Sequence, residues 1–212
     1  MLPEIAFYSE ILPIIFYLIF LKRNRGEGLW VIFIYCVLSP LTELLYFLIK
    51  SQAVFACFNI VQFTLFSIFC YFSLKEKKLK YIPVIGALIF YAVALSKFND
   101  TGFDSLSQSL ASVLSLPYCI LLLYEQVKDP SIMFVYNNKK FWLIIAFFLY
   151  FSATLFLYIY YSTLSLEQRS NYWSINNFFE IVKNILFCVA FIMKKNVQRS
   201  DLTDIDMLDP DI

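Results

Sequence analysis

The stretch "WSINNFFEIVKNILFCVAFIM", residues 173–193, combines a membrane-length apolar run with a compact set of polar groups. An α-helix needs roughly 20 residues to cross a bilayer, and this stretch has that length. At about 100° per residue, the polar side chains fall within one arc of about 120° and apolar side chains cover the rest. Because polar groups in a membrane are costly, we expect this polar stripe to face the interior of a helical bundle. The stripe consists of Asn176, Asn177, Glu180, Lys183 and Asn184.

Apolar runs of similar length recur along the chain. Of its 212 residues, 60% are hydrophobic and 16% are charged, and the charges gather between the apolar runs. A soluble domain is less apolar and carries charges along its helices. The sequence therefore predicts an all-α polytopic membrane protein, with one seven-helix transmembrane domain over residues 1–195 and a short acidic cytoplasmic tail over residues 196–212. The predicted spans are about 4–21, 29–49, 54–73, 81–96, 106–124, 141–162 and 173–193.

Basic residues are distributed unequally between the two ends of these spans. Only Lys50, Lys97 and Arg169 lie at one end, whereas thirteen lie at the other. Since cytoplasmic loops carry the excess of Lys and Arg, we expect the N-terminus outside and the C-terminus in the cytoplasm. The thirteen are Lys22, Arg23, Arg25, Lys75, Lys77, Lys78, Lys80, Lys128, Lys139, Lys140, Lys194, Lys195 and Arg199.

Other predicted spans place polar groups at a similar depth. With the N-terminus outside, Glu10 and Glu43 fall in the outer halves of spans one and two. Asn59 and Gln62 lie in the outer half to the middle of span three, and Gln108 lies near the outer end of span five. The cytoplasmic halves have no equivalent set. We therefore expect these residues and the polar stripe to line a ligand-binding or coupling pocket that opens to the outside.

A structural interpretation of the stripe stays open beside the functional one. Glu180 and Lys183 are three residues apart, which allows them to form a self-neutralised pair. Such buried polar groups also hold membrane helices together without binding any ligand. On this interpretation the cluster is a tie between helices rather than a site.

The composition argues against several classes of function. The chain has no His, and its five Cys fall inside apolar runs without C-x-x-C spacing. The commonest general base and metal ligand are therefore missing. We expect no enzyme, no catalytic residue, no cofactor and no bound metal, and the net charge of +1 gives no reason to expect nucleic acid as a partner.

An internal similarity suggests a duplicated unit. Three pairs of segments match in the same order along the two halves, which predicts spans one to three and five to seven as parallel repeats, with span four as the linker. Chance similarity among apolar helices is the alternative. The pairs are "ILPII" (11–15) with "SLPYC" (115–119), "LWVIF" (29–33) with "FWLII" (141–145), and "NIVQFTLFS" (59–67) with "EIVKNILFC" (180–188).

This three-plus-one-plus-three plan resembles that of the sugar-facilitator and PQ-loop transporters. The resemblance implies transport of a small solute that binds at the interface between the repeats. The Pro-Gln motif of those families is missing, because Pro13 precedes Ile14 and Pro117 precedes Tyr118.

A second resemblance rests on the last two spans. "FWLIIAFFLYFSATLF" (141–156) and "IVKNILF" (181–187) are similar to the last helices of small uncharacterised bacterial seven-helix membrane proteins, which are related to sensor-kinase membrane modules. This implies a bacterial inner-membrane sensor, receptor-like or accessory protein, whose partners are the lipid bilayer and a signalling protein or small solute. Because a transporter needs polar groups reachable from both sides, the apolar cytoplasmic halves favour the sensor, with the transporter as the alternative.

Overall fold

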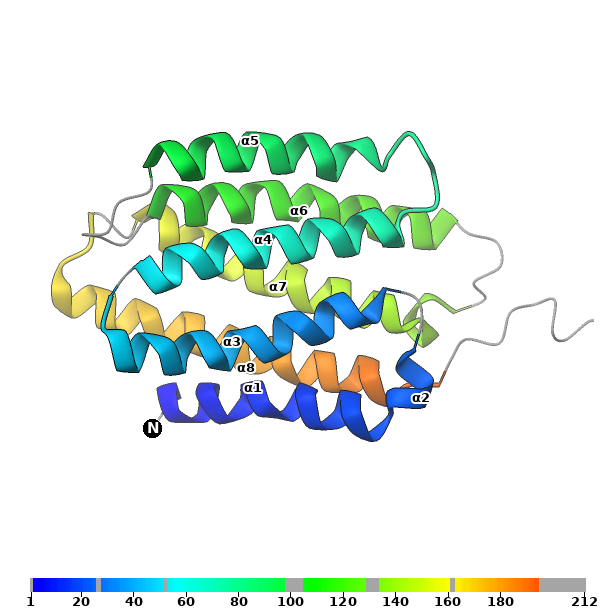
Figure 1. Cartoon of the computed structure of the whole chain (residues 1–212), viewed down its shortest axis with the longest axis horizontal. Helices are drawn as coiled ribbons and strands as arrows, with labels where there is room; N and C mark the ends of the chain where they lie inside the picture. The colour runs from blue at the N-terminus through cyan, green and yellow to red at the C-terminus, as the bar shows by residue number, and fades with distance from the viewer. Residues whose placement is uncertain are drawn as a thin grey trace, which may run out of the picture.

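Helices run side by side along one long axis of the molecule (Figure 1). The structure is a computed structural model that describes residues 2–25, 28–51, 53–97, 105–128, 134–160 and 163–194, and these contain no strand. The predicted all-α fold is therefore confirmed for the described part of the chain. The elements are α1 (Leu2–Ile19), α2 (Leu21–Asn24), α3 (Leu29–Ile49), α4 (Ala53–Ser73), α5 (Tyr81–Lys97), α6 (Ser105–Lys128), the 3-10 turn η1 (Val135–Asn137), α7 (Lys139–Tyr160) and α8 (Leu166–Ile192).

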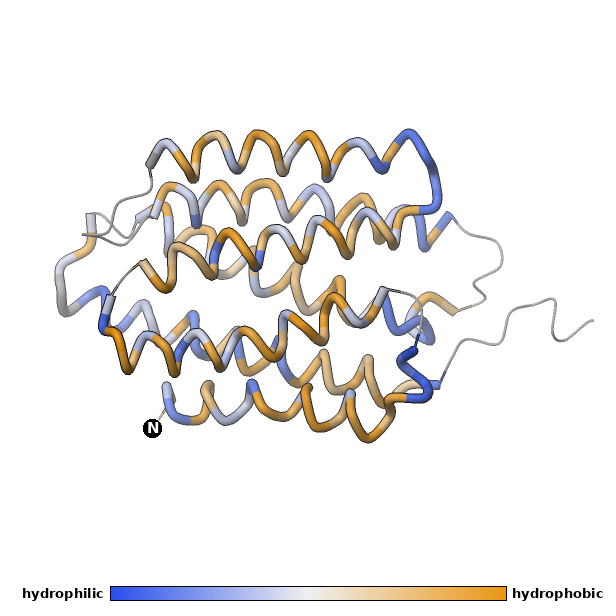
Figure 2. The backbone as a smooth tube through the Cα atoms, in the orientation of Figure 1, coloured by the Kyte–Doolittle hydropathy of each residue, from blue (hydrophilic) through white to orange (hydrophobic). Residues whose placement is uncertain are grey.

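Among the described residues, six helices are long and apolar enough to cross a membrane, namely α1, α3, α4, α6, α7 and α8. Large apolar side chains also cover the outside of the bundle, where Phe47 is 74% and Leu95 is 69% exposed. Such an extensive exposed apolar surface is unusual for a soluble monomer and marks contact with a membrane or with another protein. Figure 2 shows apolar residues along the helices and hydrophilic residues gathered at the connections.

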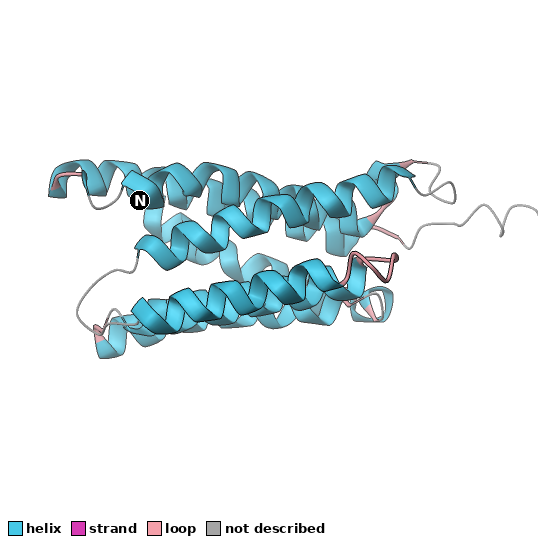
Figure 3. Cartoon of the chain, turned by 90° about the horizontal axis from the view of Figure 1, so that it is seen from above, coloured by secondary structure: helices cyan, strands magenta, loops and turns pink. Residues whose placement is uncertain are grey.

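Six of the long helices form a closed ring. α1 packs on α3, α3 on α4, α4 on α6, α6 on α7 and α7 on α8, and α8 packs on α1, which closes the ring. α5 lies outside this ring against α4 and α6, as Figure 1 shows. Figure 3 shows the bundle from above, where the helices again run along the long axis of the molecule. The ring therefore brings α8 next to α1, although these helices lie at opposite ends of the sequence.

One predicted span begins at the wrong residue. α8 begins at Leu166 rather than at residue 173. The backbone N–H of Gln168 donates to Ser165 Oγ at 3.3 Å, and the backbone N–H of Ser165 donates to Gln168 Oε1 at 3.0 Å. This reciprocal capping box satisfies amides of the first turn and starts the helix before the apolar run. Arg169, which we expected in a connection, therefore lies in the first turn of α8.

Other helix ends also differ from the predicted spans. α1 covers Leu2–Ile19 rather than 4–21, α6 continues to Lys128 rather than to residue 124, and α7 covers Lys139–Tyr160 rather than 141–162. Hydropathy marks the apolar part of a helix, whereas the hydrogen-bonded helix extends into polar residues beyond it. The predicted tail, residues 196–212, lies outside the described residues.

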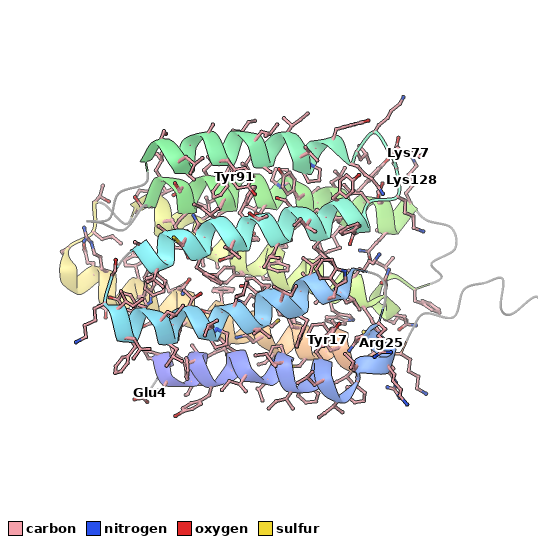
Figure 4. The ribbon with its side chains drawn as sticks, viewed as in Figure 1. Glu4, Tyr17, Arg25, Lys77, Tyr91 and Lys128 are labelled. Carbon is pink, nitrogen blue, oxygen red and sulfur yellow. The ribbon has the colours of Figure 1, made fainter. Side chains whose placement is uncertain are left out.

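The turn α2 is fixed between two other helices at the end of the bundle opposite the N-terminus. The buried Lys139 donates from Nζ to the Arg23 carbonyl and to Asn24 Oδ1, both at 2.8 Å. Asn24 Nδ2 in turn donates to the Phe191 carbonyl at 3.2 Å, in the last turn of α8. Carbonyls at a helix end lack hydrogen-bond donors within the helix, so Asn24 of α2 supplies a donor to the end of α8. Figure 4 labels Arg25, Lys77 and Lys128 at this basic end and Glu4 at the opposite end.

α5 approaches α6 closely at a glycine. A Cβ atom on Gly86 would overlap the hydroxyl of Tyr118 on α6, and it would lie 2.9 Å from the Tyr118 Cζ atom. On its other side, the Tyr91 hydroxyl of α5 lies 2.7 Å from Thr64 Oγ1 of α4. Small residues at helix interfaces allow such close packing in membranes.

The core between the middle of the bundle and the basic end is largely aromatic. Phe147 of α7 packs against Phe66 of α4 and Phe187 of α8, with ring centroids 4.6 Å and 5.1 Å away. Nearer the basic end, Phe69 and Phe191 are completely buried. Aromatic rings pack densely in such offset and tilted arrangements. The described core of this half is therefore packed by aromatic side chains.

Candidate functional site

A partly open cavity of about 290 Å³ lies in the half of the bundle nearest the N-terminus. Six helices contribute to its wall. The lining residues of α3 and α7 lie in the C-terminal halves of these helices, and those of α1, α4, α6 and α8 lie before or near the midpoints of theirs. Consecutive helices run in opposite directions, and this is why such distant stretches of sequence meet at one level. Seven of the ten predicted site residues line the cavity, namely Glu10, Glu43, Gln62, Gln108, Asn176, Asn177 and Glu180.

The other three predicted residues lie elsewhere. Lys183 and Asn184 are buried on α8, beside the cavity rather than on its wall. Asn59 is also buried, on α4, and it does not line the cavity. We expected Asn59 to share a wall with Gln62, which lies three residues away on α4, but only Gln62 of the two lines the cavity. The structure therefore brings together most of the predicted set and leaves Asn59 out.

Three carboxylates from three helices converge in the cavity. Glu10 comes from α1, Glu43 from α3 and Glu180 from α8, and one oxygen of each lies within 4.8 Å of the others. Carboxylate oxygens so close together repel one another unless a cation or a proton lies between them. These three residues are the set in the described chain that could hold a metal ion or another cation. The sequence predicted that they share a pocket, but not that their oxygens lie close enough to form a metal set.

Glu10 is the most enclosed of the three carboxylates. Its residue is 3% exposed, and its Oε1 atom accepts a hydrogen bond of 2.5 Å from the Ser39 hydroxyl. Its Oε2 atom is buried and has no hydrogen-bond partner among the described residues. A buried polar atom without a partner is uncommon because it loses its hydration without compensation. Glu43, by contrast, is half-buried.

Lys183 is held by a carboxylate and by aromatic side chains. Its residue is 1% exposed, and its Nζ atom donates to Glu180 Oε1 at 2.9 Å and to the Tyr35 hydroxyl at 2.7 Å. The same atom lies 4.6 Å from the ring centroid of Tyr150 and 5.0 Å from that of Tyr35. Opposite charge, hydrogen bonds and ring faces together offset the cost of burying an ammonium group. The predicted Glu180–Lys183 pair is therefore present.

The amides of the stripe connect α8 to its two neighbours. Asn176 Oδ1 accepts hydrogen bonds from the hydroxyls of Tyr150 and Tyr158 on α7, both at 3.4 Å. Asn184 Nδ2 donates to Ser9 Oγ on α1 at 2.9 Å. A polar stripe that faces the bundle interior can satisfy its hydrogen bonds in this way, as membrane helices require. The predicted inward orientation of the stripe is therefore confirmed.

Several residues of the site had no distinct signal in the sequence. Tyr35, Tyr150 and Tyr158 are three among 15 tyrosines. Ser39 could have been noticed because it precedes Pro40, and a proline inside a membrane helix frees a carbonyl and bends the chain. Trp173 also lines the cavity, at the position where we expected the seventh span to begin. Their roles follow from contacts between helices, which no single stretch encodes.

The site is suited to binding. Three carboxyl groups, those of Glu10, Glu43 and Glu180, gather beside the single ammonium group of Lys183, so the site can accept a cation. Amide and phenol groups around the cavity offer further hydrogen bonds, and aromatic rings offer apolar contact. Pockets that combine apolar walls with a few polar groups are typical of small-molecule sites.

Comparisons with known proteins add no relative to this picture. No protein-family model, no curated protein and no solved structure matches the chain. The resemblances to sensor-kinase membrane modules and to PQ-loop transporters therefore stay predictions. The function has to be argued from the geometry of the cavity.

Proposed function

We propose that the chain crosses the membrane seven times, with its N-terminus outside and its C-terminus in the cytoplasm of a bacterial cell. α5 would be the seventh span, because its 17 residues reach the lower limit for crossing a bilayer and it lies parallel to α4 and α6 (Figure 1). The orientation is supported by the basic residues, since Arg25, Lys77 and Lys128 lie at the end opposite the N-terminus (Figure 4).

The proposed repeat would pair α1, α3 and α4 with α6, α7 and α8, with α5 as the linker. In both groups each helix packs on the next one along the chain, which is compatible with a duplicated unit. This packing is also the ordinary result of short connections between antiparallel helices. The repeat therefore stays a prediction.

Within this topology we propose that the protein is a receptor-like sensor or accessory protein that binds a small ligand from the outside. One observation carries the proposal: Glu10, Glu43 and Glu180 converge from three helices on one partly open cavity in the outer half of the bundle. Ionisable groups inside a membrane bundle are costly to place and are usually functional. A ligand that contacts three helices can shift these helices relative to one another. Through such a shift a sensor can pass a signal to a partner protein.

A transporter of small solutes is the second candidate. The observation that favours it is that the cavity lies between the two halves of the proposed repeat, where transporters bind their substrates. The aromatic core around Phe69, Phe147 and Phe191 argues against it, because these buried rings pack together toward the basic end. Transport would require these helices to separate.

Labelling of introduced cysteines tests both the orientation and the access to the cavity. In a Cys57→Ser background, which removes the exposed cysteine of the described chain, Gln108→Cys places a thiol on the cavity wall. We expect a membrane-impermeant thiol reagent to label Gln108→Cys in intact cells. Lys77→Cys, at the basic end, should react only after permeabilisation. Labelling of Lys77→Cys in intact cells would reverse the topology, and protection of Gln108→Cys in every condition would remove the outward pocket.

Flux measurements separate the two candidate functions. The purified protein is reconstituted into liposomes and tested with labelled glucose, glutamate and choline, which represent neutral, anionic and cationic solutes. We expect no flux above that of empty liposomes. Saturable uptake that is lost in Glu43→Gln would establish the transporter instead of the sensor.

A further inference from the structure

We propose that the ligand of the cavity is an organic compound with a protonated primary amine, whose ammonium group binds between Glu10, Glu43 and Glu180. This inference rests on the proposed function, because it names the chemical class of ligand for the same cavity. Four observations carry it, namely an unpartnered oxygen, the spacing of the carboxylates, the way in which the chain holds its own buried ammonium group, and the size of the cavity.

The first observation is the unpartnered oxygen of Glu10. The side chain is almost completely buried and lines the cavity, and its Oε2 atom lacks a hydrogen-bond partner among the described residues. Its other oxygen is oriented by the Ser39 hydroxyl. An oriented acceptor that lacks a donor is complementary to a ligand that brings N–H groups. A ligand with only acceptor atoms would leave it unsatisfied.

The second observation is the spacing of the three carboxylates. An ammonium nitrogen donates charge-assisted hydrogen bonds of about 2.8 Å. Acceptors around a tetrahedral nitrogen at that distance lie about 4.6 Å apart. One oxygen from each of Glu10, Glu43 and Glu180 lies within 4.8 Å of the others, so the three can surround a single ammonium group.

The third observation is Lys183, because it shows that this chain stabilises an ammonium group in the same half of the bundle. Its Nζ atom is held by a Glu180 oxygen, by the Tyr35 hydroxyl and by the ring faces of Tyr35 and Tyr150. The wall of the cavity offers the same kinds of group. Glu10 and Glu43 supply carboxylates, and Tyr158, Phe58 and Trp173 supply rings.

The fourth observation is the size of the cavity. A hard metal ion binds oxygen ligands at about 2.0–2.6 Å and would occupy a small part of the 290 Å³. The aromatic walls at Phe55, Phe58 and Trp173 offer little to a metal ion or to its hydration water. They suit an apolar body attached to the ammonium group. The amides of Gln62 and Gln108 can then bind polar groups on that body.

Fluorescence of Trp173 provides a direct readout of binding. The chain has three tryptophans, so Trp30→Phe and Trp142→Phe leave Trp173 on the cavity wall as the sole reporter. The purified full chain is titrated with methylammonium, butylammonium, benzylammonium and phenethylammonium chlorides. Methanol, butan-1-ol, benzyl alcohol and phenethyl alcohol are the matched neutral compounds. We expect at least one ammonium compound to bind saturably and its alcohol to bind at least about tenfold more weakly, because loss of the charged hydrogen bonds removes the main attraction.

Two carboxylate variants and one matched control assign the site. Glu43→Gln and, separately, Glu10→Gln should weaken ammonium binding by about 30-fold or more, as expected when a buried charge pair loses one partner. Glu4→Gln removes an exposed carboxylate at the same end of α1 and should leave the affinity within about twofold. Since Glu43 is half-buried and has no hydrogen bond to another side chain among those described, Glu43→Gln preserves folding best, which the melting temperature checks.

The other outcomes overturn this inference without deciding the proposed function. Equal binding of ammonium compounds and alcohols, or binding unchanged in both Glu43→Gln and Glu10→Gln, would remove the ammonium class. Saturable binding of calcium, magnesium or manganese chloride without any ammonium compound would make the triad a metal site. Absence of binding by the whole ammonium series would also reject the inference. In each case, labelling of Gln108→Cys from the outside still decides whether the cavity is an external pocket.

Discussion

Lys183 Nζ lies 2.9 Å from Glu180 Oε1, one turn away on α8, and both side chains are buried in the middle of the bundle. This pair is both a tie and a part of the cavity wall. Lys183 lies behind Glu180 and is held by Tyr35 of α3, whereas Glu180 faces the cavity. The structural and functional interpretations of the polar stripe are therefore compatible. The ammonium group of Lys183 fixes the orientation of a carboxylate that remains open to a ligand.

Replacement of Lys183 tests the structural part of this arrangement. Lys183→Met leaves the Glu180 carboxylate buried without its cation, and we expect the free energy of unfolding to fall by about 3–5 kcal/mol. The double variant Lys183→Met/Glu180→Gln should recover most of this loss, because no unpaired charge remains. Unfolding of the purified protein by SDS in mixed micelles measures both effects.

The control for this cycle is Lys22→Met, which removes an exposed lysine at the basic end. It should change the stability by less than about 1 kcal/mol. If Lys183→Met and the double variant were equally unstable, the loss would come from packing around residue 183 rather than from an uncompensated charge.

Gly86 should be intolerant of a methyl group. Gly86→Ala places a Cβ atom against the Tyr118 ring and hydroxyl, so α5 has to move away from α6. We expect a loss of about 1–3 kcal/mol, as is typical of overpacking. Thermal unfolding in detergent measures this loss.

Tyr118→Phe in the Gly86→Ala protein provides the matched rescue. It removes the hydroxyl that overlaps most and leaves the ring carbon at 2.9 Å, so we expect partial recovery. Tyr118→Phe alone should have a small effect, because the one hydrogen bond of its hydroxyl among the described residues is long, at 3.5 Å to the Ile82 carbonyl. Failure of the rescue would place the strain elsewhere in the α5–α6 contact.

Asn24 should be important for the basic end of the bundle. Asn24→Ala removes both the acceptor for Lys139 and the donor to the Phe191 carbonyl. Loss of these two buried hydrogen bonds is expected to lower the free energy of unfolding by about 1–3 kcal/mol. Hydrogen–deuterium exchange should increase in the last turn of α8 and in the first turn of α7. An increase spread evenly over all helices would instead indicate global destabilisation without a local tie.

Glu125 should hold the connection between α4 and α5 in a fixed conformation. Its two carboxylate oxygens accept the backbone N–H groups of Lys75 and Glu76, both at 3.0 Å. Glu125→Ala leaves these N–H groups to water, and we expect a loss of about 0.5–2 kcal/mol, similar to that of a helix cap. Limited proteolysis by trypsin at Lys77 and Lys78 should become faster. The exposed Glu4→Ala is the control, and unchanged cleavage in Glu125→Ala would contradict the role.

Much of the fold could be predicted from local patterns. Each predicted span corresponds to a helix, and six of these helices are long and apolar enough to cross a membrane. An apolar run of membrane length has few other ways to satisfy its backbone. The residues at which the helices begin and end were less predictable. The start of α8 depended on the capping box of Ser165 and Gln168, which lies outside the apolar run that hydropathy detects. The inward orientation of the polar stripe was predictable, because the stripe occupies one face of the helix.

The site was predictable in its residues more than in its geometry. Glu10, Glu43 and Glu180 could each be recognised as costly residues inside apolar runs, and their depth could be inferred from the charge asymmetry. That their oxygens meet within 4.8 Å could not be inferred, because it depends on how α1, α3 and α8 rotate and pack. Asn59 shows that depth in the membrane does not by itself identify a residue of the cavity wall. It lies one helical turn from the cavity-lining Gln62, yet its side chain does not line the cavity.

Local sequence patterns dictate that the chain forms long apolar helices. They also indicate which end of the bundle carries the basic residues and which side chains are too polar to face lipid. These properties follow from composition and from the 3.6-residue period of each helix separately. Helix packing, by contrast, places α8 against α1 and brings three carboxylates into one cavity beside Lys183. Side chains from different helices meet only after packing has fixed the rotation and the neighbours of each helix. This information is distributed over every interface of the bundle.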